Sequence, residues 1–198
     1  MTTLIRSLFS GEHPLILASK SPQRSRILEM FDVPFRAVDS EFEEVIEAGS
    51  APEEAAELLA QGKAQKVSEK FPSSIVVGVD TIVVSAQGEI LEKPKDREDA
   101  RRMLLGKSGQ KETVISGICL ITAGKTFVHH EKAEIHFSKF SENDIEWMLD
   151  LNEWQGKSGA ISVEGKSSIY IDRIDGNFWN IVGFPIPTFL KMLQKIAI

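Results

Sequence analysis

Hydrophobic and polar positions along this chain alternate between a strand-like and a helix-like pattern. Residues 15–19 (LILAS) form a short apolar run, and residues 22–31 then place their apolar side chains on one helical face. Residues 52–70 predict a second helix, which opens on a proline and carries acids in its first turn, where the helix dipole favours them. The alternation continues without a low-complexity linker or an internal repeat, so the sequence predicts an α/β fold around one main sheet.

The most apolar stretch of the chain is residues 73–85 (SSIVVGVDTIVVS), which predicts a strand covered on both faces. Residues 85–90 (SAQGEI) predict a turn into an antiparallel partner that ends at Lys93–Pro94. Residues 113–123 and 127–137 are also typical of strands. We therefore expect the main sheet to be built around the middle of the chain.

Two more helices are indicated by their start signals. Asp96 predicts an N-cap for residues 97–105, with Gly106 just past the helix end, and Ser141 with Asp144 predicts a capping box. The charges of these helices are explained by helix construction alone. We expect short strands and turns over residues 157–165, 167–176 and 177–185, before a final amphipathic helix from about Pro187.

Composition limits the classes of protein that this chain can represent. With 198 residues, of which 42% are hydrophobic, it is expected to form one compact domain over residues 1–198. It has no apolar run long enough to cross a bilayer and no signal peptide, which predicts a cytoplasmic protein without a membrane partner. The formal net charge of −6 argues against nucleic-acid binding. The single cysteine, Cys119, is expected to be a small buried hydrophobic residue.

The segment LILASKSPQR contains the start of a helix whose first turn is unusually basic. Ser21 fits an N-cap and Pro22 the first helical position, which by itself is ordinary helix construction. Arg24 and Arg26 then fall in the first turn, where a cation is unfavourable by up to ~1 kcal/mol at exposed sites. Hydroxyls of Ser19 and Ser21, backbone N–H groups and a guanidinium converge there, which indicates a phosphate site.

The second chemical signal is an acid inside the apolar strand. Asp80 interrupts IVVGVDTIVV and shares a strand face with Gly78, which we expect to leave open space beside the carboxylate. An aspartate can also end a strand by binding backbone amides, but Ile82 and the valines after it continue the pattern. A buried carboxylate must be neutral, paired or metal-bound, so Asp80 is a candidate functional residue.

Four short motifs in sequence order, ASKSPQR, GVDT, EKP and VGFP, resemble the Maf family of nucleotide pyrophosphatases. The resemblance covers nearly the whole chain. It implies hydrolysis of a nucleoside triphosphate between its α- and β-phosphates, with Mg²⁺ or Mn²⁺ required. The implied fold is an elongated mixed β-sheet flanked by helices, in two lobes with a central cleft, similar to the house-cleaning inosine triphosphatases. Homodimers are common in such proteins.

The resemblance also assigns roles to residues. Arg24, Lys63 and Lys93 are expected to hold phosphate oxygens, together with the hydroxyls of the first motif. Asp80 is either the general base or a metal ligand, and Glu44 is the second acidic ligand. Two of these have ordinary alternatives, because Glu44 lies in an acidic run typical of a solvated loop and Lys63 in a helix where Lys66 looks equivalent. The functional residues that the resemblance implies are Ser19, Ser21, Arg24, Glu44, Lys63, Asp80 and Lys93.

Base preference in this family is associated with the positions of Gln23, Thr81 and Glu164. The chain mixes two family patterns there, one resembling pyrimidine-preferring members and one resembling members that act on 7-methyl-GTP. An ionised Glu164 accepts hydrogen bonds only, which suits the N1–H and N2–H₂ donors of guanine. An aromatic residue at position 23, which would stack on a methylated base, is absent. The sequence therefore predicts nucleoside triphosphate specificity without defining the base.

Other functions compete with this enzyme hypothesis. A nucleotide-binding regulator of cell division would need the cationic residues but not the base, so Asp80 favours catalysis. A phosphatase acting on monoesters lacks an obvious nucleophile, and Cys119 offers none. His130 and His136 share a strand face, six residues apart, and are interpreted as an exposed strand edge rather than a metal site.

Overall fold

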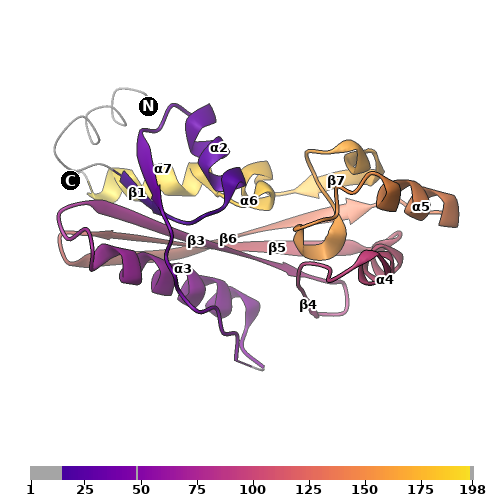
Figure 1. Cartoon of the computed structure of the whole chain (residues 1–198), viewed down its shortest axis with the longest axis horizontal. Helices are drawn as coiled ribbons and strands as arrows, with labels where there is room; N and C mark the ends of the chain where they lie inside the picture. The colour runs from indigo at the N-terminus through magenta and orange to yellow at the C-terminus, as the bar shows by residue number, and fades with distance from the viewer. Residues whose placement is uncertain (1–14, 48, 197–198) are drawn as a thin grey trace. The chain divides into compact units, whose positions relative to one another are not determined.

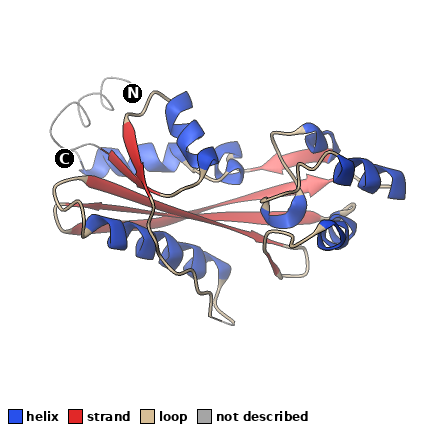
Figure 2. Ribbon diagram, in the orientation of Figure 1, coloured by secondary structure: helices blue, strands red, loops and turns tan. Residues whose placement is uncertain are grey.

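The computed structural model describes residues 15–47 and 49–196. Their elements confirm the predicted α/β class, with a seven-stranded sheet and helices around it (Figure 1, Figure 2). In chain order these elements are β1 (Leu15–Ala18), α2 (Pro22–Met30), β2 (Phe35–Val38), α3 (Pro52–Ser68), β3 (Ile75–Val84), β4 (Ile90–Leu91), α4 (Arg97–Lys107), β5 (Lys111–Thr122), β6 (Lys125–Phe137), α5 (Glu142–Asp150), the 3₁₀ helices η1 (Ser158–Ala160) and η2 (Lys166–Tyr170), β7 (Ile171–Asp175), α6 (Phe178–Val182) and α7 (Ile186–Ile196).

The sheet is mixed, with strand order β2-β1-β3-β5-β6-β7 and β4 paired to β3. β1 runs parallel to both β2 and β3, whereas β3 pairs antiparallel with β4, and β6 with β7. β5 and β6 are joined by Ala123 and Gly124, whose φ angles are 46° and 76°. Two consecutive positive φ values match the type I′ turn that connects adjacent antiparallel strands.

The chain divides into two compact units. Unit 1 comprises residues 1–81, 116–131 and 183–198, and unit 2 comprises residues 82–115 and 132–182. The strands β3, β5 and β6 therefore contribute one part of their length to each unit. Each unit has its own apolar core.

In unit 1, helix α3 packs closely on the sheet because glycines face it. A Cβ atom on Gly78 of β3 would collide with the backbone of Ala60, and one on Gly117 of β5 with the backbone of Ala56. Figure 1 shows α7 on the opposite side of the strands from α3. Between α3 and the sheet lies an apolar cluster of Ile16, Ala18, Ala60, Ala64, Val67, Val76 and Cys119.

In unit 2, α4 and α5 pack on one another and on η1 through Ala100, Leu104, Ile145, Leu149 and Ala160, among others. Both predicted helix starts are confirmed. The Asp96 side chain accepts from the Asp99 N–H at 2.8 Å, and Ser141 forms the reciprocal capping box with Asp144. These caps satisfy backbone donors that have no partner inside the helix.

Helix α4 ends later than the sequence predicted. The helix continues through Gly106 to Lys107, and the glycine with a left-handed backbone is Gly109, at φ 65°. The Gly109 N–H donates to the Ser138 carbonyl at 2.9 Å, which turns the chain toward β5. A tertiary hydrogen bond therefore holds the backbone just beyond the end of this helix.

The predicted strands near the C-terminus were also wrong in part. Residues 158–160 form a 3₁₀ helix, and Phe178–Val182 form the short helix α6 instead of a strand. The Asn177 side chain accepts from the Trp179 N–H at 3.0 Å, which starts α6. Of the described helices, none combines the length and the apolar character that crossing a membrane requires.

Candidate active site

The start of α2 is built as the sequence predicted. The Ser21 side chain caps the helix by accepting from the Arg24 N–H at 3.4 Å, and Pro22 occupies the first turn. The Ser19 Oγ accepts from the Ser21 N–H at 3.1 Å. The two hydroxyls thus lie together at the end of a buried strand, beside the backbone N–H groups of the first helical turn.

Arg24 turns back toward the sheet instead of into solvent. Its Nη1 donates to the Ser19 Oγ at 3.2 Å, and its Nε donates to the Gly183 carbonyl at 3.1 Å. Burial lowers the pKa of Arg24, while attraction to Asp80 and Glu44 opposes this shift. A guanidinium held by two acceptors in a partly buried place is preoriented for an anion.

The Gly183 carbonyl was not predicted as part of this site. The sequence showed VGFP only as a motif of the resemblance, without a role. In the structure Gly183 has φ 108°, a backbone conformation that favours glycine, and its carbonyl holds Arg24 from the connection between α6 and α7. Only the isolated glycine in the motif signalled that the backbone there is special.

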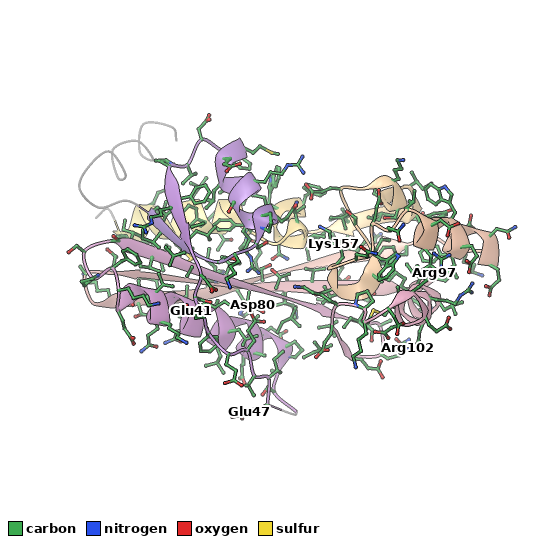
Figure 3. The ribbon with its side chains drawn as sticks, in the orientation of Figure 1. Glu41, Glu47, Asp80, Arg97, Arg102 and Lys157 are labelled. Carbon is green, nitrogen blue, oxygen red and sulfur yellow. The ribbon has the colours of Figure 1, made fainter. Side chains whose placement is uncertain are left out.

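Asp80, labelled in Figure 3, lies buried on β3 in unit 1, and it is linked to Glu44 through Lys63. The Lys63 Nζ forms an ion pair with the Asp80 carboxylate, and it lies 2.7 Å from the Glu44 Oε1. The side chains of Lys63 and Asp80 are 7% and 9% exposed, whereas that of Glu44 is 56% exposed. This chain of carboxylate, ammonium and carboxylate therefore leads from the strand to solvent.

Helix α3 explains why Lys63 and not Lys66 occupies this place. Lys63 is buried on the helix side that faces the sheet, whereas Lys66 is exposed and donates to the Glu41 carbonyl. The expected open space beside Asp80 was wrong. The space at Gly78 is filled by the backbone of Ala60 and Ala64, so the glycine lets α3 approach closely enough for Lys63 to reach Asp80.

The donor set here suits a hard divalent cation. Asp80 and Glu44 supply carboxylate oxygens, the ligands that Mg²⁺ and Mn²⁺ prefer. The Lys63 ammonium already lies between the two carboxylates, which shows that the place attracts positive charge. The ligand types therefore match the cation that the sequence resemblance implies, with the Lys63 ammonium occupying the position between them in this structure.

The remaining predicted site residues are divided between the two units. Thr81 belongs to unit 1, where its hydroxyl lies 2.9 Å from the Ser116 Oγ, and Gln23 lies on α2. Lys93 and Glu164 are exposed residues of unit 2. The structure thus brings the predicted phosphate-binding and acidic residues together within unit 1, with the exception of Lys93.

Unit 2 also contains a cluster that the sequence did not reveal. Glu134, His136 and Asp175 each offer one possible metal-ligand atom, and these atoms lie within 4.8 Å of one another. The pairing of β6 with β7 brings Asp175 to this cluster. Lys111 lies 2.7 Å from the Glu134 carboxylate and Arg173 lies 2.8 Å from that of Asp175, so both acids already have cationic partners.

Buried Cys119 takes no part in either cluster. It lies in the apolar layer between α3 and the sheet, with an exposed fraction of 0%. Burial raises the pKa of its thiol to about 12, so the reactive thiolate is strongly disfavoured at neutral pH. The predicted role as a small buried hydrophobic residue is confirmed.

The fold places this chain in a known structural class. It is similar to the Ham1 protein of Staphylococcus aureus, with a TM-score of 0.51 and 16% sequence identity, over 91% of this chain and 98% of that chain. At this level of identity the likeness concerns the fold alone. The predicted fold, a mixed sheet flanked by helices, is therefore shared with a known structure.

The sequence comparison identifies the family. The profile of the Maf-like protein family matches residues 14–196, and the chain belongs to this family. Among its relatives, a dTTP/UTP pyrophosphatase of Pyrococcus abyssi is 40% identical over 181 residues, which cover 91% of this chain and 95% of that protein. A dTTP/UTP pyrophosphatase of Symbiobacterium thermophilum is 37% identical over 183 residues, covering 92% and 94% respectively.

Proposed function

We propose that the protein hydrolyses nucleoside triphosphates to the nucleoside monophosphate and pyrophosphate. One observation carries the proposal: the hydroxyl and guanidinium groups of a helix start and a buried carboxylate, which Lys63 links to Glu44, lie in one unit. A polyphosphate needs the first feature, and activation of water needs the second. The names of the P. abyssi and S. thermophilum relatives support this reaction.

Phosphate binding is assigned to the start of α2. The hydroxyls of Ser19 and Ser21 and the guanidinium of Arg24 supply donors, and the helix N-terminus supplies a partial positive charge. Because Ser19 and Gly183 already hold Arg24, little reorientation is needed when the anion arrives. Preoriented donors of this kind stabilise charge that develops in a transition state.

Water activation is assigned to the group around Asp80. As a general base, its carboxylate would accept a proton from the attacking water; as a metal ligand, it would share a cation with Glu44. A bound Mg²⁺ or Mn²⁺ would neutralise phosphate charge and lower the pKa of its water ligand. Lys63 keeps two carboxylates stable side by side, and we assign to Lys93 a further contact with the triphosphate.

The setting of this reaction is part of the proposal. We infer a house-cleaning enzyme of the cytoplasm that requires a divalent cation, works as a homodimer and forms a single Maf-like domain over residues 1–198. Net charge of −6 and the lack of a described membrane-spanning helix are compatible with this setting. The family resemblance supports the dimer and the metal requirement.

Two signals bear on the nucleobase of the triphosphate substrate, and they favour different bases. The relatives named above act on dTTP and UTP by their names, whereas Glu164 favours the hydrogen-bond donors of guanine. We therefore propose the class of substrate, and we select dTTP, UTP, GTP and 7-methyl-GTP as the informative set.

The test is a product assay with purified protein. Each triphosphate is incubated with Mg²⁺ or Mn²⁺ and with chelator, and products are separated by anion-exchange chromatography. Monophosphate plus pyrophosphate, lost on chelation, is expected. Diphosphate plus orthophosphate would contradict the proposed bond cleavage. Tight binding without turnover of any triphosphate would favour the nucleotide-binding regulator instead.

A further inference from the structure

Unit 2 contains a buried ion pair that the proposed reaction does not use. The Lys107 Nζ lies 3.0 Å from one carboxylate oxygen of Glu112 and 3.1 Å from the other. The two side chains are 1% and 3% exposed. Burial lowers the pKa of Lys107 and raises that of Glu112, and their mutual attraction opposes both shifts. The pair therefore lies where the charged forms of both side chains lose nearly all of their hydration.

Stability alone is a poor explanation for such a pair. Replacing a buried ion pair by apolar residues of similar volume often leaves a protein as stable or makes it more stable. A buried pair is better understood through the other groups that it holds. Here the ammonium of Lys107 also donates to the Gly159 carbonyl, and it lies 5.1 Å from the ring centroid of Phe137.

Gly159 is held at both of its backbone polar groups. Its carbonyl accepts from Lys107, and its N–H donates to the Glu92 carbonyl at 3.2 Å. Its φ is 73°, and a Cβ atom there would lie 3.3 Å from the Lys107 Nζ and 3.4 Å from a Glu112 carboxylate oxygen. Glycine is therefore favoured by the backbone conformation, and a Cβ atom there would press against the ion pair.

The Glu92 carbonyl belongs to the EKP motif. It immediately precedes Lys93, which is exposed and follows β4, a strand of only two residues. A long, flexible side chain at such a place is positioned mainly by its backbone. The hydrogen bond from Gly159 is a direct tertiary anchor for that backbone.

We propose that Lys107, fixed by Glu112, is a positioning residue for Lys93. Lys107 holds Gly159, and Gly159 holds the peptide carbonyl from which Lys93 continues. The ion pair thereby defines the backbone position from which the Lys93 side chain extends. The inference rests on the proposed function for the role of Lys93, but the anchoring itself is independent of any substrate.

The first experiment measures the anchor without substrate. Lys107→Met combined with Glu112→Leu removes both charges at similar volume and leaves no buried charge unpaired. Amide hydrogen exchange of Gly159, followed by NMR, is expected to accelerate about tenfold or more, as for local opening, while the α5 amides of the same unit stay within about twofold. Equal exchange at Gly159 in the two proteins would overturn the inference.

A matched control is available in the same unit. Lys111 and Glu134 also form a lysine–glutamate pair, at 2.7 Å, but on the surface. Lys111→Met combined with Glu134→Gln is expected to leave both Gly159 exchange and triphosphate binding unchanged. Acceleration at Gly159 in this control would show that the effect is not specific to the buried pair, and would also overturn the inference.

The second experiment asks whether the pair acts through Lys93. The dissociation constant of an α,β-methylene triphosphate is measured for a cycle in which Lys93→Ala is combined with the Lys107/Glu112 replacement. We expect the replacement to weaken binding about tenfold when Lys93 is present and less than about twofold when it is alanine, since coupled residues are non-additive. The same loss in both backgrounds would contradict a positioning role.

These experiments distinguish a failure of the proposed function from a failure of the proposed anchoring. A wild-type protein that neither binds nor hydrolyses triphosphates would remove the proposed function, whereas Gly159 exchange would still decide the anchoring. If the double replacement does not fold, Lys107→Gln with Glu112→Gln is judged by the same criteria. Exchange in the wild type is a further check that needs no variant, because unprotected exchange at Gly159 would itself refute the anchor.

Discussion

Single residues carry most of the chemistry assigned to this protein. Asp80 is an acid inside an apolar strand, and it forms an ion pair with Lys63, whose side chain is as buried as that of Asp80. Its carboxylate oxygens are hydrogen-bond acceptors that lie beside an ammonium group. This environment is suited to a base or a metal ligand, the two roles between which the sequence left the choice open.

Replacing Asp80 by asparagine keeps the shape of the side chain and removes its charge. Turnover is expected to fall by about 10²–10⁴-fold, the range typical of a lost general base, with the dissociation constant of a non-hydrolysable triphosphate little changed. Steady-state kinetics and isothermal titration calorimetry measure the two effects. Asp172→Asn, an exposed acid on β7, is the control and should be neutral. Full activity of Asp80→Asn would exclude Asp80 from catalysis.

Gly78 is predicted to be required for the packing of α3. A methyl group there would meet the backbone of Ala60 and Ala64, so Gly78→Ala is expected to destabilise the protein by about 1–3 kcal/mol through overpacking. Urea unfolding measures this change. Gly106→Ala provides the control, because a Cβ at that helical position meets nothing within 4 Å. A neutral Gly78→Ala would show that α3 can move away at no cost.

At the scale of helices and strands, hydrogen bonds between segments determine how the elements are joined, which the hydrophobic periodicity of the sequence does not predict. α5 illustrates this, since Asp144 accepts from the Ser141 N–H at 2.7 Å and from the Tyr170 hydroxyl at 2.6 Å. The first contact is local and was predicted from the sequence. The second joins α5 to η2 and depends on tertiary packing.

The stability contributed by Asp144 is expected to depend on pH. Hydrogen bonds from the Ser141 hydroxyl, the Tyr170 hydroxyl and the Ser141 N–H lower the pKa of Asp144 from its usual 3.8. A lowered pKa means that the contribution is complete well above pH 3.8 and is lost as pH falls through the folded-state value. The urea midpoints of wild type and Asp144→Asn should therefore differ at neutral pH and converge in acid. Glu142→Gln in the same helical turn is the control, and parallel pH curves for Asp144→Asn would contradict the assignment.

The connection between α6 and α7 is expected to influence substrate binding through α2. Gly183→Ala forces a side chain into φ 108° and displaces the carbonyl that holds Arg24. We expect KM for the triphosphate to rise about tenfold with a smaller change in kcat, because a binding residue is misplaced. Gly88→Ala places a similar strain, at φ 86°, in a surface turn and serves as the control. Equal kinetics in both variants would remove Gly183 from the site.

At the scale of the whole molecule, the predicted roles are divided between two compact units. Unit 1 contains the candidate phosphate-binding and acidic residues, whereas Lys93 and the candidate base reader Glu164 belong to unit 2. Since strands β3, β5 and β6 contribute to both units, each unit is assembled from segments distant in the chain. Each unit therefore contains a part of the set of predicted functional residues.

Glu164→Gln tests base recognition at this scale. An amide can donate to a pyrimidine carbonyl, which a carboxylate cannot, so kcat/KM for dTTP and UTP relative to GTP should increase about tenfold. Competition assays with paired substrates measure this ratio directly. Glu98→Gln, an exposed acid of the same unit, is the control. An unchanged substrate ranking would separate Glu164 from base selection.

The sequence by itself determined the features that depend on neighbours along the chain. The α/β alternation, the capped start of α2, the capping box of α5 and the buried strand around Asp80 all follow from periodicity and local hydrogen bonding. Short segments such as α6 and η1 were mispredicted, because few residues carry little periodic signal. Ordered motifs were sufficient to reveal the family.

Only the tertiary structure decided which distant groups meet. It selected Lys63 over Lys66, directed Arg24 to the Gly183 carbonyl, and enclosed Lys107 with Glu112 beside Gly159. These contacts depend on how closely a helix approaches a strand and on the exact course of a turn. Such distances result from packing over the whole unit, and no local pattern of residues specifies them.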